Sequence, residues 1–166
     1  MQGALVRLRP ATSDDIPALV AIRRTPEVYA WWGGTDIAAS VASDLQDPAL
    51  HILVIEWENR VVGLIQWYEE TDPDYRHAGI DIFLDPAVHR RGLGTDAIRT
   101  LARHLFVDHG HHRLIIDPAV ANTAAIDCYR KIGFQPVGVM RRYERGPDGT
   151  WHDNLLMDLL AEEFVS

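Results

Sequence analysis

The pattern of hydrophobic and polar positions divides the chain into short apolar runs and segments with helical spacing. Runs that are continuous or alternate with polar residues indicate strands, because neighbouring side chains of a strand point to opposite faces. We therefore predict seven strands, at residues 5–11, 51–58, 61–70, 79–85, 112–119, 134–146 and 150–160. Apolar residues three and four positions apart indicate four helices, at residues 14–25, 36–47, 94–110 and 122–133. Residues 29–34, YAWWGG, are predicted to form a loop.

Residues that favour helix ends and turns support these boundaries. Ser13 and Thr35 are typical N-caps of the first two helices, and a hairpin turn is predicted at Asn59-Arg60. The order β-α-α-β-β-β-α-β-α-β-β joins an antiparallel first half to a βαβ crossover. We expect an α/β (α+β) fold in a single domain over residues 1–166.

Composition narrows the function classes. With 166 residues and 47% hydrophobic residues, the chain can bury one core. No apolar run is long enough for a membrane span, and the single cysteine, Cys128, excludes an internal disulfide, so a cytoplasmic location is expected. The net charge of −8 argues against a nucleic-acid partner. It fits a small cationic ligand, and it fits simple solubility equally well. A monomer and a homodimer both remain open.

The most informative segment is HRRGLGTDAIRTL, residues 89–101, which follows a predicted strand and opens a predicted helix. Gly92 and Gly94 leave backbone N–H groups free to converge on an anion at the positive end of that helix. Arg90 and Arg91 add positive charge beside them. The segment therefore predicts a pyrophosphate site, although a glycine turn between a strand and a helix can also be purely structural.

A second segment, NTAAIDCYRKIGF at residues 122–134, extends this prediction. Asn122, Ala125 and Tyr129 have helical spacing and share one face. The helix follows a strand that ends at Asp117, so two helices begin near the carboxyl ends of neighbouring strands. That arrangement is typical of a ligand cleft.

Together, HRRGLG and NTAAIDCYRKIGF resemble the acetyl-CoA site of the GCN5-related N-acetyltransferase (GNAT) superfamily. The resemblance implies a mixed, mostly antiparallel sheet of about seven strands with a splayed central parallel pair, flanked by four helices. It also implies acetyl-CoA (coenzyme A) as cofactor and direct acyl transfer to an amine. His89 departs from the superfamily's Gln/Arg-x-x-Gly-x-Gly/Ala pattern, which puts only the contact of that residue in question.

The resemblance also implies roles for individual residues. Tyr129 would protonate the leaving thiolate, the alternative being a tyrosine that only fills the core. Cys128 is expected to pack rather than react. The implied cofactor-binding residues are Phe83, Leu84, His89, Arg90, Arg91, Gly92, Leu93, Gly94, Thr95, Asn122, Ala125 and Tyr129.

The acceptor is suggested by separate blocks over most of the chain. WWGG, GLIQWY, EETDPDYRHAGID and IIDPAVANTAAIDCYRKIGF resemble the aminoglycoside 6′-N-acetyltransferases. In that subfamily the paired tryptophans border the antibiotic and the carboxylates face its ammonium groups. The implied substrate-binding residues are Trp31, Trp32, Gln66, Asp81 and Asp117. The alternative for the tryptophans is that they only close the end of the core.

Asp81 stands out because it interrupts an apolar strand, where an unpaired carboxylate is costly. Near a thioester it could act as general base, directly or through a water molecule. Asp117 could face the same cleft, but an Asp-Pro pair also starts turns.

Two observations keep other functions open. The segment RRYERGPDGTWHDNLLM, residues 141–157, also resembles acetyltransferases that modify ribosomal protein N-termini or other small amines. Arg141, Arg142 and Arg145 would disfavour a polycation if they faced the pocket. The alternatives are therefore an enzyme for a protein N-terminus or a metabolite or siderophore amine, and a non-catalytic CoA-sensing module.

Four histidines, His104, His109, His111 and His112, gather around one predicted helix end. Their spacing fixes no tetrahedral metal site, and histidines near a helix C-terminus are expected from the helix dipole. We therefore expect no metal site.

Overall fold

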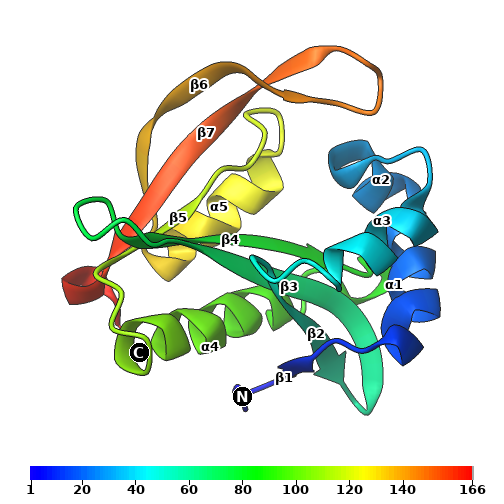
Figure 1. Ribbon diagram of the computed structural model, residues 1–166, viewed down its shortest axis with the longest axis horizontal. Helices are drawn as coiled ribbons and strands as arrows, with labels where there is room; N and C mark the ends of the chain where they lie inside the picture. Colours follow the sequence, from blue (N-terminus) through cyan, green and yellow to red (C-terminus); the bar gives the residue numbers. More distant parts are fainter. Residues whose placement is uncertain (166) are drawn as a thin grey trace.

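The computed structural model describes residues 1–165 and contains one mixed sheet (Figure 1). Within these residues the sheet order is β1-β2-β3-β4-β5-β7-β6. The strands are β1 (Arg7–Pro10), β2 (His51–Trp57), β3 (Arg60–Glu70), β4 (His77–Leu84), β5 (Arg113–Ile116), β6 (Gln135–Arg145) and β7 (Trp151–Leu160). The helices are α1 (Ile16–Arg23), α2 (Pro26–Trp32), α3 (Ile37–Asp44), α4 (Leu93–Val107) and α5 (Thr123–Ile132).

The sheet is antiparallel except between β4 and β5, which run parallel. This confirms the predicted mixed sheet of seven strands with one central parallel pair. Antiparallel neighbours need only short connections, whereas the parallel pair requires a crossover, and α4 supplies it.

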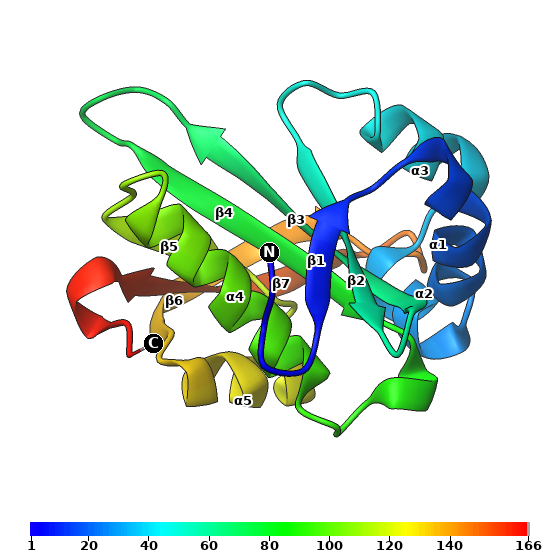
Figure 2. The ribbon, with the colours of Figure 1, turned by 90° about the horizontal axis from the view of Figure 1, so that it is seen from below.

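Both faces of the central strands are buried, which explains their nearly continuous apolar sequences. In β2, Leu53 and Ile55 face the larger core under α4 and α5, while Ile52 and Val54 face a second core under α1 and α3. Figures 1 and 2 show α1, α2 and α3 gathered at one end of the molecule, with α4 and α5 covering the opposite face. No helix within residues 1–165 is both long enough and apolar enough to cross a membrane.

The prediction of a loop at residues 29–34 was wrong for its first four residues. Residues 26–32 form α2, so the described chain has five α-helices rather than the four predicted. Pro26 occupies the first turn after an extended Thr25, a combination that favours helix initiation. Gly33, with a φ of 50°, ends the helix directly after the two tryptophans.

Three predicted boundaries also shift. Thr12, rather than Ser13, is the N-cap of a 3-10 turn that precedes the first helix. Its backbone N–H donates to Asp15 Oδ2 at 2.8 Å. Asp36 rather than Thr35 caps α3, accepting a hydrogen bond from the Ala39 N–H. The β2–β3 turn lies one residue earlier than predicted, because Glu58 and Asn59 take the positive φ values that a tight hairpin needs.

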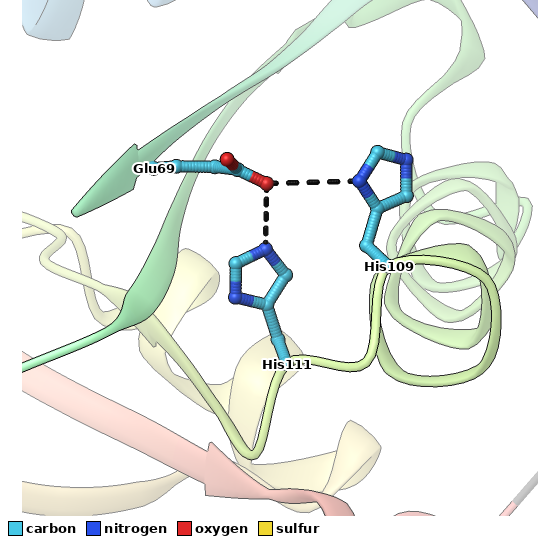
Figure 3. Close-up of side chains that lie close together, drawn as sticks. All are labelled: Glu69, His109 and His111. Atoms are coloured by element: carbon cyan, nitrogen blue, oxygen red, sulfur yellow. Dashed lines mark hydrogen bonds and ion pairs between the residues drawn. The ribbon is translucent and has the colours of Figure 1, made fainter. Parts of the chain in front are cut away.

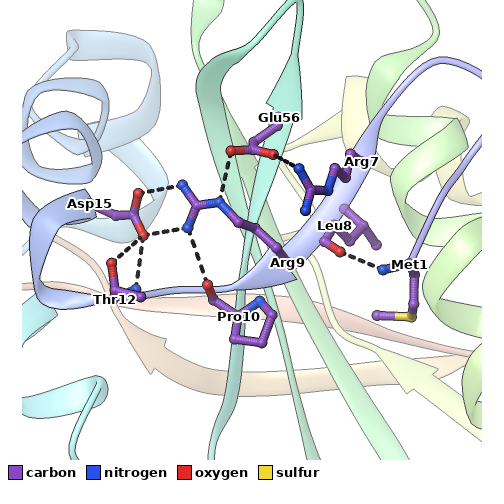
Figure 4. Close-up of polar contacts among 8 residues, drawn as sticks. All are labelled: Met1, Arg7, Leu8, Arg9, Pro10, Thr12, Asp15 and Glu56. Carbon is purple, nitrogen blue, oxygen red and sulfur yellow. Dashed lines mark hydrogen bonds and ion pairs between the residues drawn. The ribbon is translucent and has the colours of Figure 1, made fainter.

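A partly buried ion-pair network fixes the first strand against the second and against the turn before α1 (Figure 4). The Arg9 guanidinium donates to both carboxylate oxygens of Asp15 at 2.7 Å and to Glu56 Oε1 at 2.7 Å. The hydrogen bonds from Arg9 lower the pKa of Asp15 to about 2. Asp15 therefore stays ionised, and the network stabilises the fold above pH ~4 and loses that contribution as the pH falls toward 2.

Candidate active site

The turn between β4 and α4 has the geometry of an anion site. Gly92 is the N-cap of α4 with a φ of 80°, a left-handed conformation that favours glycine, and Arg90 also has a positive φ of 62°. A Cβ on Gly94 would lie 3.1 Å from Leu84 Cδ1, so α4 begins close against the end of β4. The first backbone N–H groups of a helix have no intrahelical partners. They can therefore bind a pyrophosphate here.

Neighbouring side chains leave this helix end free for an anion. The carboxylate of Asp96, in the first turn of α4, is turned toward the N-terminal segment, where it accepts hydrogen bonds from the Leu5 and Val6 N–H groups at 2.7 and 2.9 Å. The Arg91 guanidinium lies 5.1 Å from the Trp57 ring centre. His89, the residue that departs from the superfamily pattern, directs Nε2 to the Leu84 carbonyl at 3.1 Å.

An opening between β4 and β5 adjoins this turn. The two strands are paired only at Ala78–Leu114 and Gly79–Ile115, although β4 continues to Leu84. The splay that the resemblance implied is therefore present. Phe83 lies in the part of β4 beyond the paired residues, where the backbone edge that faces β5 has no strand partner. An extended amide-containing group can bond to such an edge.

A pocket of about 430 Å³ opens at the same place. It brings together four of the five predicted substrate residues, from α2, β4 and the end of β5, with the predicted catalytic Tyr129. Gln66 is not in the lining, but its side chain supports the site by donating to Asp81 Oδ2 at 3.1 Å. The lining residues are Trp31, Trp32, Tyr68, Asp81, Ile82, Ile116, Asp117, Pro118, Ala119, Asn122, Tyr129, Tyr143, Glu144 and Asn154.

The carboxylates make the pocket strongly acidic. Burial raises the pKa of Asp81, and the hydrogen bond from Gln66 only partly offsets this effect. Burial, with repulsion from Asp81, raises the pKa of Asp117 to about 6. Glu144 adds a third carboxylate to the lining. The shifts of Asp81 and Asp117 are toward their protonated forms, and a cationic ligand would favour the ionised forms.

Tyr129 and Asn122 come from α5, as the helical spacing predicted. The Asn122 side chain caps α5 by accepting a hydrogen bond from the Ala125 N–H at 3.3 Å, and Ala125 itself packs on the core rather than lining the pocket. Burial raises the pKa of Tyr129, so its hydroxyl keeps its proton at neutral pH. Cys128 is half-buried and lies 3.4 Å from the Thr95 hydroxyl.

The two tryptophans have different surroundings. Both are half-buried and both line the pocket. Trp32 also packs edge-on against Phe83 at 4.9 Å and under the Arg23 guanidinium at 5.5 Å. Trp32 therefore closes the smaller core as well as forming a pocket wall.

Sequence reasoning missed four polar lining residues, Tyr68, Tyr143, Glu144 and Asn154. The pairing of β6 with β7 is irregular between Met140 and Glu144, which changes the facing of the side chains in between. Asn154 then bonds to Glu144 Oε2 at 3.0 Å and to the Asp117 carbonyl at 2.8 Å. The sequence carries no signal for this irregularity.

The arginines that would oppose a polycation do not line this pocket. Arg141 and Arg142 border a separate hollow with Asp153, whose Oδ1 accepts a hydrogen bond from the Arg142 N–H at 2.7 Å.

The sequence matches the family described as Acetyltransferase (GNAT) domain over residues 6–135, most of the chain. The chain belongs to the GNAT family. The GNAT fold accounts for the splayed strand pair, and the cofactor of this enzyme is acetyl-CoA. The helix end at Gly92 and the opening beside β4 fit the pyrophosphate and the amide-containing arm of that cofactor.

Its similar proteins differ in acceptor. Aminoglycoside N(6′)-acetyltransferase type 1 of Klebsiella pneumoniae is 31% identical over 165 residues, covering 87% of this chain and 79% of that protein. Spermidine N(1)-acetyltransferase of Escherichia coli (strain K12) is 25% identical over 167 residues, covering 97% and 89%. The crystal structure of aminoglycoside acetyltransferase AAC(6′)-Ib in complex with coenzyme A has a TM-score of 0.77 at 27% identity, covering 95% of this chain and 96% of that one. This GNAT protein is therefore an N-acetyltransferase whose amine is not fixed by its relatives.

Substitution of Gly92 tests the anion site. Gly92→Val should weaken CoA binding at least about 10-fold, because a branched side chain at a φ of 80° displaces the N–H groups that face the phosphates. CoA affinity is measured by calorimetry, together with the melting temperature. Gly110→Val is the matched control, since Gly110 has a φ of 68° at the far end of α4. Equal losses of CoA affinity in both variants would contradict the assignment.

Proposed function

We propose that the protein transfers the acetyl group of acetyl-CoA to a primary amine of a small polycation, the 6′-amine of an aminoglycoside. The observation that carries this proposal is the acidic pocket at the point where β4 and β5 separate. Three carboxylates and two tryptophans share its lining. Carboxylates pair with ammonium groups, and aromatic faces bind cations and sugar rings.

The residues suggest a direct transfer. Asp81 would accept the proton of the attacking ammonium, directly or through a water molecule, and its raised pKa makes it a stronger base than an exposed aspartate. The amine nitrogen would then bond to the thioester carbonyl carbon, and the C–S bond would break. Tyr129, which is protonated at neutral pH, would donate its proton to the leaving thiolate, and the remaining surplus proton of the attacking nitrogen would restore the tyrosine hydroxyl. No covalent enzyme intermediate is needed.

A thiol-release assay tests the acceptor. Purified protein with acetyl-CoA should release CoA rapidly and saturably with kanamycin or tobramycin. Release should be absent with an aminoglycoside that carries a hydroxyl in place of the 6′-amine. A higher kcat/KM with spermidine would reassign the acceptor to polyamines, which the similarity to spermidine N(1)-acetyltransferase makes the second candidate. CoA binding without release from any amine would contradict an enzymatic role for this pocket.

Replacement of Asp81 tests the base. Asp81→Asn keeps the size of the side chain but removes the proton acceptor, so kcat should fall about 100-fold or more. The melting temperature should stay the same or rise, because the substitution removes a buried carboxylate. Asp127→Asn, an exposed aspartate on α5, should leave both values unchanged. Activity of Asp81→Asn near that of wild type would show that Asp81 is not the base.

Replacement of Asp117 tests how much the acidic pocket lowers the stability of the fold. Its folded pKa of about 6 lies above the usual 3.8, so its ionisation destabilises the fold once the pH rises above ~4. Asp117→Asn should therefore stabilise the free protein by about 1–2 kcal/mol at pH 7, and the gain should disappear below pH ~4. Thermal melts across this pH range measure the effect. The same variant should raise the KM for the polycation. A loss of stability at pH 7 would contradict the predicted destabilisation of the fold by the ionised Asp117 carboxylate.

A further inference from the structure

A second polar cluster lies away from the pocket. Glu69 at the end of β3, His109 just after α4 and His111 just before β5 point toward one another (Figure 3). Glu69 Oε1 lies 2.9 Å from His111 Nε2 and 3.6 Å from His109 Nδ1, and the three atoms all lie within 4.8 Å of one another. The cluster sits at the end of α4 opposite Gly92, about 22 Å along a 15-residue helix.

Hydrogen bonds behind His109 hold its ring in place. His104 Nδ1 lies 2.6 Å from Asp108 Oδ2, and His104 Nε2 lies 3.2 Å from His109 Nε2. This chain leaves His109 Nδ1 facing the Glu69 carboxylate, 3.6 Å from Oε1. Both atoms can act as metal ligands, so a cation can bind between them.

His111 completes the cluster from the interior. The residue is only 2% exposed, and Nε2 faces the same oxygen of Glu69. Nδ1 of His111 has no hydrogen-bond partner among the described residues. Movement of the ring proton to Nδ1 would free Nε2 as a ligand, and its bond to the ion would replace its hydrogen bond to Glu69.

The distances between the ligand atoms of the cluster suit a small divalent ion. Zinc bonded to histidine nitrogen and carboxylate oxygen at about 2.0–2.2 Å in a tetrahedral arrangement places its ligand atoms about 3.3 Å apart. The distances of 2.9 and 3.6 Å lie on either side of that value. The Glu69 and His109 side chains are 27% and 34% exposed, which leaves a side open for water as a fourth ligand. The hydrogen bond from His109 to His104, and on to Asp108, is the outer-shell support that metal-binding histidines commonly have.

We propose that Glu69, His109 and His111 form a binding site for a divalent transition-metal ion of the Zn²⁺ class. The ion ties the end of β3 to the connection between α4 and β5. That connection is already positioned by Arg76, which donates to the His109 carbonyl at 2.8 Å. Tyr68, the neighbour of Glu69 on β3, lines the acidic pocket, so the ion stabilises the strand that forms one pocket wall. This site is independent of the proposed acceptor.

The test uses protein without a histidine tag, and Zn²⁺ binding is measured by calorimetry in the absence of CoA and amine. Wild type should bind one Zn²⁺ per chain and melt at a higher temperature with the ion present. Glu69→Gln, which keeps the shape and an acceptor for His111, should weaken binding at least 10-fold, and so should His109→Ala. His112→Ala is the matched control, because His112 is exposed in the same connection but outside the cluster.

A second measurement identifies the ligands. Co²⁺ in place of Zn²⁺ should give the intense visible absorption of a tetrahedral complex in wild type and in His112→Ala, and not in Glu69→Gln. Melting curves without metal confirm that each variant is folded. The proposal is overturned if wild type binds no Zn²⁺ at micromolar concentrations. It is equally overturned if Glu69→Gln and His109→Ala bind as tightly as wild type, or if His112→Ala alone loses the ion.

Discussion

The separation of β4 from β5 is the constraint on which the site depends. Two residue pairs hold these parallel strands together before they part. Beyond that point the inner edge of β4 has backbone groups without a strand partner, which cost free energy unless another group bonds to them. Because α4 and α5 each follow one of the two strands, their N-termini lie on either side of the opening. One feature of the sheet therefore creates the space for the cofactor arm and positions the helix ends around it.

The same opening concentrates negative charge, which lowers the stability of the fold. Burial raises the pKa of both Asp81 and Asp117, and repulsion from Asp81 raises the pKa of Asp117 further. A folded protein without ligand gains nothing from this arrangement. The proposed cationic acceptor would reverse this effect by stabilising both carboxylates, and on that proposal part of the folding stability would be exchanged for complementarity to the substrate.

The pocket draws on residues both inside and outside the range that matches the family. The helix ends and the splayed strands lie within residues 6–135, the range that matches the family. Tyr143, Glu144 and Asn154 lie after that range, on the β6–β7 hairpin. The turn of this hairpin reaches α2, since a Cβ on Gly33 would lie 3.0 Å from Pro147 Cγ. One wall of the pocket thus comes from the hairpin after the matched range, whereas the tryptophans and the two aspartates lie within that range.

The sequence by itself determined the features that depend on neighbouring residues. The glycine turn before α4, the Asn122 cap and the isolated charge of Asp81 are local patterns, and each occupies the position that its pattern indicated. The start of α2 was local as well, in Thr25-Pro26, but the adjacent tryptophans and glycines suggested a loop. Only the tertiary structure decided which distant side chains meet. Glu69 reaches His109 and His111 across some 40 residues, and the irregular pairing of β6 with β7 brings Glu144 to Asp117. These side-chain contacts depend on strand register and on where helices cross the sheet. The packing of the whole core determines both.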